Sequence, residues 1–87
     1  MPQQRVSLVA KVECRSESRG EERPIALTVG GRRIGIVDTL ERALVSAADA
    51  GGPVRARFTV ELEDGSLVLL ERSLPAGDWR VWRIDTV

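Results

Sequence analysis

Apolar and polar residues alternate along most of this chain, which is the pattern of β-strands with one buried face. Residues 5–14 form the longest alternating run, and only Val9 interrupts its polar side. The alternation places Cys14 on the inward side, where it packs as a small apolar residue. The same pattern predicts further strands at about 24–29, 32–37, 54–62, 66–72 and 79–85.

Glycine pairs and Asp-Gly steps separate several of these runs. Gly30-Gly31 stands between 24–29 and 32–37, which predicts a tight hairpin with a type I′ turn, because both central positions of that turn need a positive φ. Asp64-Gly65 predicts a second hairpin, also with a type I′ turn, between 54–62 and 66–72.

The middle of the sequence has a helical pattern instead. Asp38 and Glu41 have the spacing of a capping box, and apolar residues then recur at helical intervals. These residues are Leu40, Ala43, Leu44, Ala47 and Ala48. The sequence Gly51-Gly52-Pro53 would end such a helix, so we predict one over about 39–50.

Together these elements predict a single domain over 1–87, of α+β class and mainly β. The expected order is βββαβββ, with six antiparallel strands in a sheet or small barrel and one short helix; an all-β small barrel is the alternative. Residues 67–70 are apolar on both faces, so the strand at 66–72 is expected to be central.

Composition excludes several chemistries. The 87 residues include no histidine and one cysteine, so histidine-based acid–base catalysis, Cys-His triads and the common zinc sites are ruled out. Thirteen basic and thirteen acidic residues cancel, which leaves no overall field for nucleic acid or anionic lipid. We therefore predict no catalytic, cofactor-binding or metal-binding residues, and no enzyme activity. The lone cysteine and the lack of an apolar leader or membrane span predict a cytoplasmic location.

Arginine and tryptophan mark the candidate interaction surface. Trp79 and Trp82 are three residues apart on a strand, so they point to opposite faces, one buried and one exposed or at an edge, unless a barrel encloses both. Arginine beside an exposed indole is typical of protein-binding hot spots and of base-stacking platforms. Cross-strand pairing with Glu61, Glu63 and Glu71 is the alternative role of Arg55 and Arg57. The candidate surface comprises Arg32, Arg33, Arg55, Arg57, Trp79, Arg80, Trp82 and Arg83.

Several short motifs resemble a family of small bacterial proteins of unknown function. They are Glu22-Arg23-Pro24, Gly31-Arg32-Arg33-Ile34, Glu63-Asp64-Gly65, and a close over 77–85 that contains Gly77, Trp79 and Arg83. The residue after Gly-Arg-Arg is usually aromatic in that family, and here it is Ile34. The resemblance implies a small β module and supplies no catalytic residues.

These observations predict a non-enzymatic interaction module that binds a protein partner or itself, the latter as a homodimer paired through the 5–14 strand. The alternative is a nucleic-acid-associated small β-barrel that uses the arginines and an exposed tryptophan. No membrane association is expected.

Overall fold

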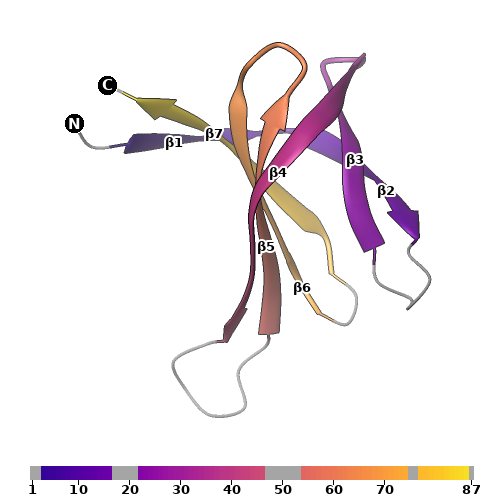
Figure 1. The fold of residues 1–87 in the computed structure, drawn as a ribbon, viewed down its shortest axis with the longest axis vertical. Coiled ribbons are helices and arrows are strands. Elements are labelled where there is room, and N and C mark those ends of the chain that lie inside the picture. The colour runs from indigo at the N-terminus through magenta and orange to yellow at the C-terminus, as the bar shows by residue number, and fades with distance from the viewer. Residues whose placement is uncertain (1–2, 17–21, 47–53, 75–76, 87) are drawn as a thin grey trace.

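The computed structural model describes residues 3–16, 22–46, 54–74 and 77–86. These residues form seven antiparallel strands in one curled sheet, and none of them is helical (Figure 1). The strands are β1 (Gln3–Leu8), β2 (Ala10–Ser16), β3 (Glu22–Val29), β4 (Arg32–Ser46), β5 (Val54–Leu62), β6 (Leu67–Ser73) and β7 (Trp79–Thr86). The mainly β, antiparallel prediction is confirmed, whereas the count of six strands and the helix are wrong.

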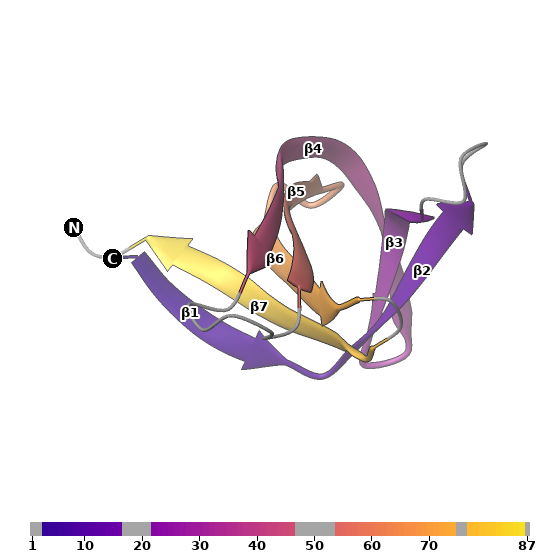
Figure 2. The ribbon, with the colours of Figure 1, turned by 90° about the horizontal axis from the view of Figure 1, so that it is seen from below.

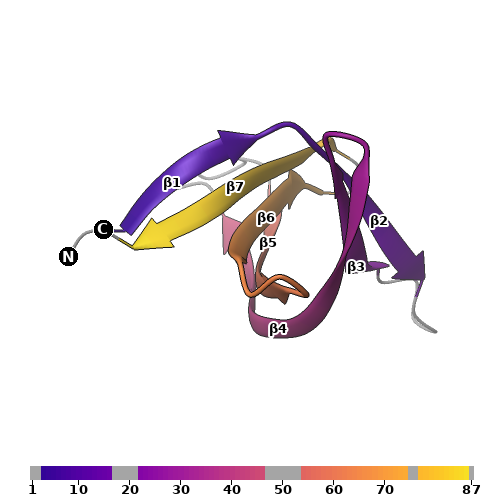
Figure 3. The ribbon, with the colours of Figure 1, turned by 90° about the horizontal axis from the view of Figure 1, so that it is seen from above.

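The sheet has the order β1-β7-β6-β5-β4-β3-β2, so consecutive strands β1 and β2 form its two opposite edges. Only Val9, which is 96% exposed, separates them. The predicted 5–14 strand is thus bent into two strands at the one residue that breaks its polar side. Figures 2 and 3 show the two ends of the sheet curving toward each other around this bend, which makes a half-barrel.

The core fills the concave side of the half-barrel. Its centre is Leu27 of β3, and the remaining buried residues come from alternate positions of β5, β6 and β7. These are Phe58, Val60, Leu62, Val68, Leu70 and Val81. Leu8, Ala10 and Val12 of β1 and β2 pack against this cluster, so the alternation in 5–14 continues through the bend. Burial of such aliphatic side chains, worth about 1.5–3 kcal/mol each, drives the curling.

The predicted helix is replaced by the second half of β4. Residues 36–46 pair with β5, and the register shifts twice because Val37 and Leu40 have no partner on β5. Each β-bulge adds one residue to β4. The residues of β4 that oppose the core residues of β5 are therefore spaced three apart instead of two, and they are Ile36, Thr39 and Arg42. The apolar residues that suggested a helix do not form a buried face of this strand, since Leu40, a bulge residue, is 51% exposed and Leu44 is 72% exposed. Residues 47–50 of the predicted helix lie outside the described residues.

Both predicted hairpins are present, with different turns. Gly30 and Gly31 have φ angles of 58° and 79°, as a type I′ turn requires. In the second hairpin only Gly65 has a positive φ, 85°; its N–H donates to the Leu62 carbonyl, and the Leu62 N–H donates to the Ser66 carbonyl. That turn is a longer one closed by a glycine in the left-handed region, so a type I′ turn at Asp64-Gly65 is wrong.

A third bulge lies opposite Cys14. Glu13 pairs with Ala26 and Cys14 with Pro24, which leaves Ile25 of β3 without a partner on β2. Because the extra residue is in β3, β2 keeps its alternation and Cys14 is half-buried. Proline is tolerated at Pro24 since it needs no ladder hydrogen bond at a bulge.

Candidate functional site

The outer face of the half-barrel, over β5, β6 and β7, brings together four of the predicted surface residues. Arg57 opposes Glu71 across β5 and β6, and Glu71 opposes Arg80 across β6 and β7, so the three side chains form one row. In the next row on the same face, Thr59, Leu69 and Trp82 follow one another. Arg55 lies one pleat beyond Arg57. We call this set, namely Arg55, Arg57, Glu71, Arg80, Leu69 and Trp82, the outer-face cluster.

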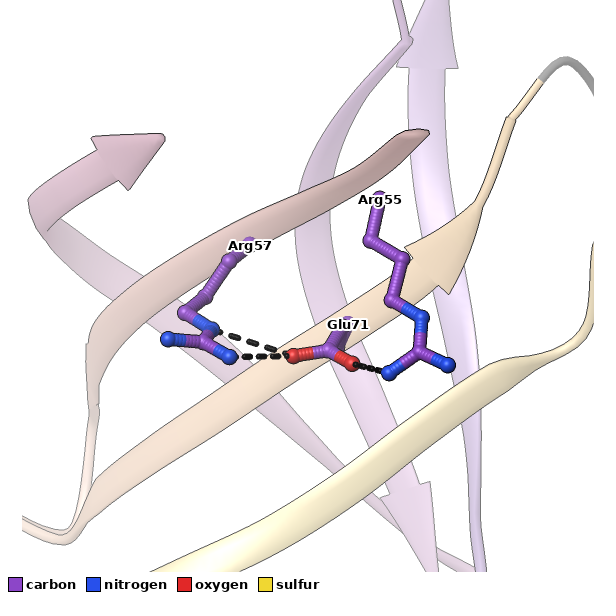
Figure 4. A network of polar contacts seen from close by, with 3 residues as sticks. All are labelled: Arg55, Arg57 and Glu71. Carbon is purple, nitrogen blue, oxygen red and sulfur yellow. Dashed lines mark hydrogen bonds and ion pairs between the residues drawn. The ribbon is translucent and has the colours of Figure 1, made fainter. Parts of the chain in front are cut away.

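Glu71 is the centre of the outer-face cluster and the one buried charged residue in the described part of the protein, at 5% exposure. Arg57 donates from Nε (3.0 Å) and Nη2 (2.9 Å) to Oε2 of Glu71. Arg55 donates from Nη1 to the other oxygen, Oε1, at 3.1 Å. Figure 4 shows the two guanidinium groups on either side of the carboxylate. Both carboxylate oxygens are therefore bonded, as a buried charge requires.

Strand geometry explains why these charges meet. In β5 the even-numbered positions Phe58 and Val60 face the core, so Arg55 and Arg57 face outward. In β6 the core takes Val68 and Leu70, and Glu71 points the other way. The pairing of Glu71 with the two arginines was predicted from the sequence and is confirmed. Of the other two predicted partners, Glu63 lies in the β5–β6 turn with its side chain against Gly35, and Glu61 opposes Asp38 of β4 and Leu67 of β6.

The second half of the outer-face cluster is apolar. Leu69 is 3% exposed although it lies outside the core cluster, and Trp82 beside it is half-buried. The run 67–70 thus places apolar side chains on both faces of β6. This strand lies between β5 and β7, so the prediction of a central strand is confirmed. The outer face therefore combines a tryptophan and a buried leucine with three arginines.

A polar hollow lies beside the Glu71 carboxylate, near Ser73 at the C-terminal end of β6. It has a volume of about 30 Å³ and is lined by Arg55, Glu71, Arg72, Ser73, Asp78 and Arg80. Among the described residues, neither Arg80 nor Asp78 has an ion-pair partner within 4 Å. Both side chains are exposed. The hollow is large enough for one or two water molecules or a group of similar size.

The structure places the remaining candidates elsewhere. Arg33, beyond the β3–β4 turn, donates to Glu13 of β2 at 3.0 and 3.1 Å, and this hydrogen bonding lowers the pKa of the Glu13 carboxyl. Its neighbour Arg32 is exposed. Arg83 opposes Val68 and so lies on the side of the sheet opposite Trp82. The residues of the candidate surface therefore do not form one patch. Only those in the outer-face cluster lie side by side.

Trp79 is part of the interior. Its ring lies 5.9 Å from that of Phe58, and the guanidinium carbon of Arg72 lies 5.0 Å from the Trp79 ring centre. Arg72 also donates to Glu22 of β3 at 2.8 Å. This contact joins residues fifty positions apart and connects β6 to β3, three places away in the sheet, across the concave side. The two tryptophans face opposite sides, as predicted. The expectation that one is buried and the other exposed or at an edge is wrong, because both are half-buried and β7 lies between β1 and β6.

Sequence reasoning missed Arg72 and Glu22. Arg72 continues the inward-facing series of Val68 and Leu70, and a charged residue at such a position indicates a contact of this kind. Cys14 lies nearby, and burial, followed by the negative charge of Glu22, raises the pKa of its thiol. A raised pKa makes the thiol a poor nucleophile.

The described residues lack two further kinds of feature. No three side chains among their cysteine, aspartate and glutamate residues gather into a potential metal site. None of their segments is a helix long and apolar enough to cross a membrane.

No family model matches the sequence, and searches of curated proteins and of solved structures found no similar protein. The resemblance to small bacterial proteins stays a prediction.

Proposed function

We propose that this protein is a non-enzymatic interaction module that binds a partner protein through its outer-face cluster. The observation that carries the proposal is the position of Trp82. It lies beside buried Leu69 on the side of the sheet away from the core, and Arg80 is its neighbour in the next row of the same face. Tryptophan and arginine are the residues most enriched at the centres of protein interfaces.

The ionic contacts favour a protein over nucleic acid. A phosphate-binding surface needs several arginines that are free to contact the backbone. Arg55 and Arg57 instead bind Glu71, Arg33 binds Glu13, and Arg32 is on a different part of the sheet. This leaves Arg80 as the arginine of the outer-face cluster with no carboxylate partner among the described residues.

Charge also disfavours a second copy of the protein at this face. In a twofold dimer the same patch meets itself, so the arginines of one outer-face cluster would oppose those of the other. A homodimer through the edge strands β1 and β2 would not use this face, and sedimentation equilibrium at tens of micromolar tests it against the monomer mass of 9.5 kDa. A mass that rises toward twice this value would support the homodimer that the sequence predicts instead.

As part of the same proposal we place the module in the cytoplasm, because a single cysteine closes no intramolecular disulfide.

Site-directed photo-crosslinking in the cells that produce the protein tests the proposal. Ser7 is exposed and lies directly opposite Trp82 across β1 and β7, so a photo-crosslinking residue there reports on the outer face without removing a cluster residue. Lys11 of β2 is an equally exposed control. We expect discrete protein adducts at position 7 and none of the same mass at position 11. Nucleic-acid adducts, or the same products at both positions, would contradict it.

A further inference from the structure

We infer that the hollow beside Glu71 binds a carboxylate group of the partner protein. This inference rests on the proposed function and adds the chemistry that the partner must present. The candidate site is the space between Arg55 and Arg80, which line the hollow from β5 and β7.

The charges around the hollow leave a single positive excess. Arg57 binds Oε2 of Glu71 with two donors and balances its charge by itself. Arg72, which also lines the hollow, is balanced by its ion pair with Glu22, so Arg55 and Arg80 are left with one carboxylate, that of Asp78. An anion with one negative charge completes this balance, whereas a phosphate dianion exceeds it.

The available donors point to the same ligand. Arg55 uses one Nη1 contact to Glu71, and 46% of its side chain is exposed, so its other guanidinium N–H groups remain available to a ligand. Arg80 is exposed and opposes Glu71 from β7, with no ion pair to any described residue. Two guanidinium groups that converge on a small polar hollow suit the planar, two-oxygen geometry of a carboxylate.

The buried carboxylate gives the site its rigidity. Glu71 fixes Arg55 from the β6 side, which reduces the side-chain entropy that a ligand would otherwise have to restrict. Trp82, which is half-buried against Leu69, lies one row away and provides apolar contact for the residues around the bound carboxylate. Glu71 is thus a positioning residue for an arginine pair, as well as a stabilising ion-pair partner.

Titration with small anions, followed by NMR, tests the inference on the intact protein. Sodium acetate is the first probe, observed through backbone amides and the Nε–Hε signals of Arg55 and Arg80. We expect saturable shifts of these two signals in the millimolar range, and at least about a fivefold weaker response in Arg80→Gln. Arg32→Gln is the matched control, since Arg32 is also exposed and without an ion pair among the described residues, and it should bind like the wild type.

Two further probes separate the sources of the carboxylate. N-acetylalanine mimics the C-terminus of a polypeptide, and the α-amide of N-acetylglutamate mimics an acidic side chain. Stronger binding of either one supports the inference and identifies the source. Absence of saturable shifts with all three probes, or inorganic phosphate binding more tightly than acetate, overturns it. These probes need no partner, so a failure here does not affect the crosslinking result at Ser7. Conversely, saturable acetate binding without protein adducts at Ser7 would contradict the proposed function and leave the anion site standing.

Discussion

Arg57 and Glu71 oppose each other across β5 and β6, and two nitrogens of the guanidinium group contact one carboxylate oxygen at 2.9 and 3.0 Å. Arg55 reaches only the second oxygen, with one contact. The two arginines therefore have unequal roles around the same buried charge. Removing Arg57 leaves Oε2 without a partner among the described contacts, whereas removing Arg55 leaves the stronger pair intact.

This inequality predicts different losses of stability. Arg57→Met should lower the free energy of unfolding by about 1–2 kcal/mol, and Arg55→Met by less than about 1 kcal/mol, values reduced from those of fully buried pairs because both arginines are partly exposed. Urea denaturation measures both. Arg80→Gln is the control and should stay within about 0.5 kcal/mol of the wild type. Equal losses for the two methionine variants would contradict the geometry.

The hairpin glycines provide a second prediction. Gly31 and Gly65 have φ angles of 79° and 85°, which β-branched residues resist. Replacing either with Val should destabilise the fold by about 1 kcal/mol or more, as seen in thermal or urea unfolding. Gly65→Asn is the matched control, because asparagine tolerates a positive φ and no atom would contact its Cβ. Valine variants as stable as the wild type would show that these turns are wrongly placed.

Acid should destabilise the protein partly through Asp64. The Ser66 N–H donates to Oδ1 of Asp64 at 3.0 Å, and this hydrogen bond lowers the pKa of the carboxyl below its ordinary value of about 3.9. The Asp64 carboxyl therefore binds a proton more readily in the unfolded protein than in the folded one. The stabilisation is complete at pH values above the unfolded pKa, and it is lost as the pH falls through the lower pKa that Asp64 has in the folded protein.

The Asp64→Asn variant isolates this contribution. Its amide oxygen still accepts the Ser66 hydrogen bond and does not titrate, so the free energy of unfolding should fall less steeply between about pH 5 and 2 than in the wild type. Parallel pH curves for the two proteins would exclude a role for Asp64. The Glu13 carboxyl, whose pKa Arg33 lowers, titrates in both proteins and does not affect the comparison.

Period-two alternation made most of the fold predictable. Strand β5 has the predicted bounds, and the central place of β6 followed from its two apolar faces. The second half of β4 was not predictable in this way, because the bulges at Val37 and Leu40 depend on pairing with β5, a long-range contact that local spacing does not contain. An isolated helix of a dozen residues has little stability of its own. The nine residue pairs between β4 and β5 therefore stabilise the strand more than the helical pattern would stabilise a helix.

The candidate site was partly predictable for the same reason. Alternation placed Arg55 and Arg57 on one face and separated Trp79 from Trp82, and cross-strand pairing brought in Glu71. Strand order decided the rest. Arg32 and Arg33 are separated from the outer-face cluster because β3 and the first part of β4 form the other end of the sheet, and the contact between Arg72 and Glu22 exists only because the sheet curls.

The central claim is that the outer-face cluster binds a protein, and that Trp82 and Arg80 serve this binding more than the stability of the fold. The most direct test compares the yield of the Ser7 photo-adduct in the wild type, Trp82→Ala and Arg80→Gln, together with the free energy of unfolding of each protein. We predict that the adduct falls by at least about fivefold in both variants, as expected when an interface hot spot is lost. Each variant should remain folded, with a cooperative unfolding transition. An unchanged adduct yield in two folded variants would contradict the claim.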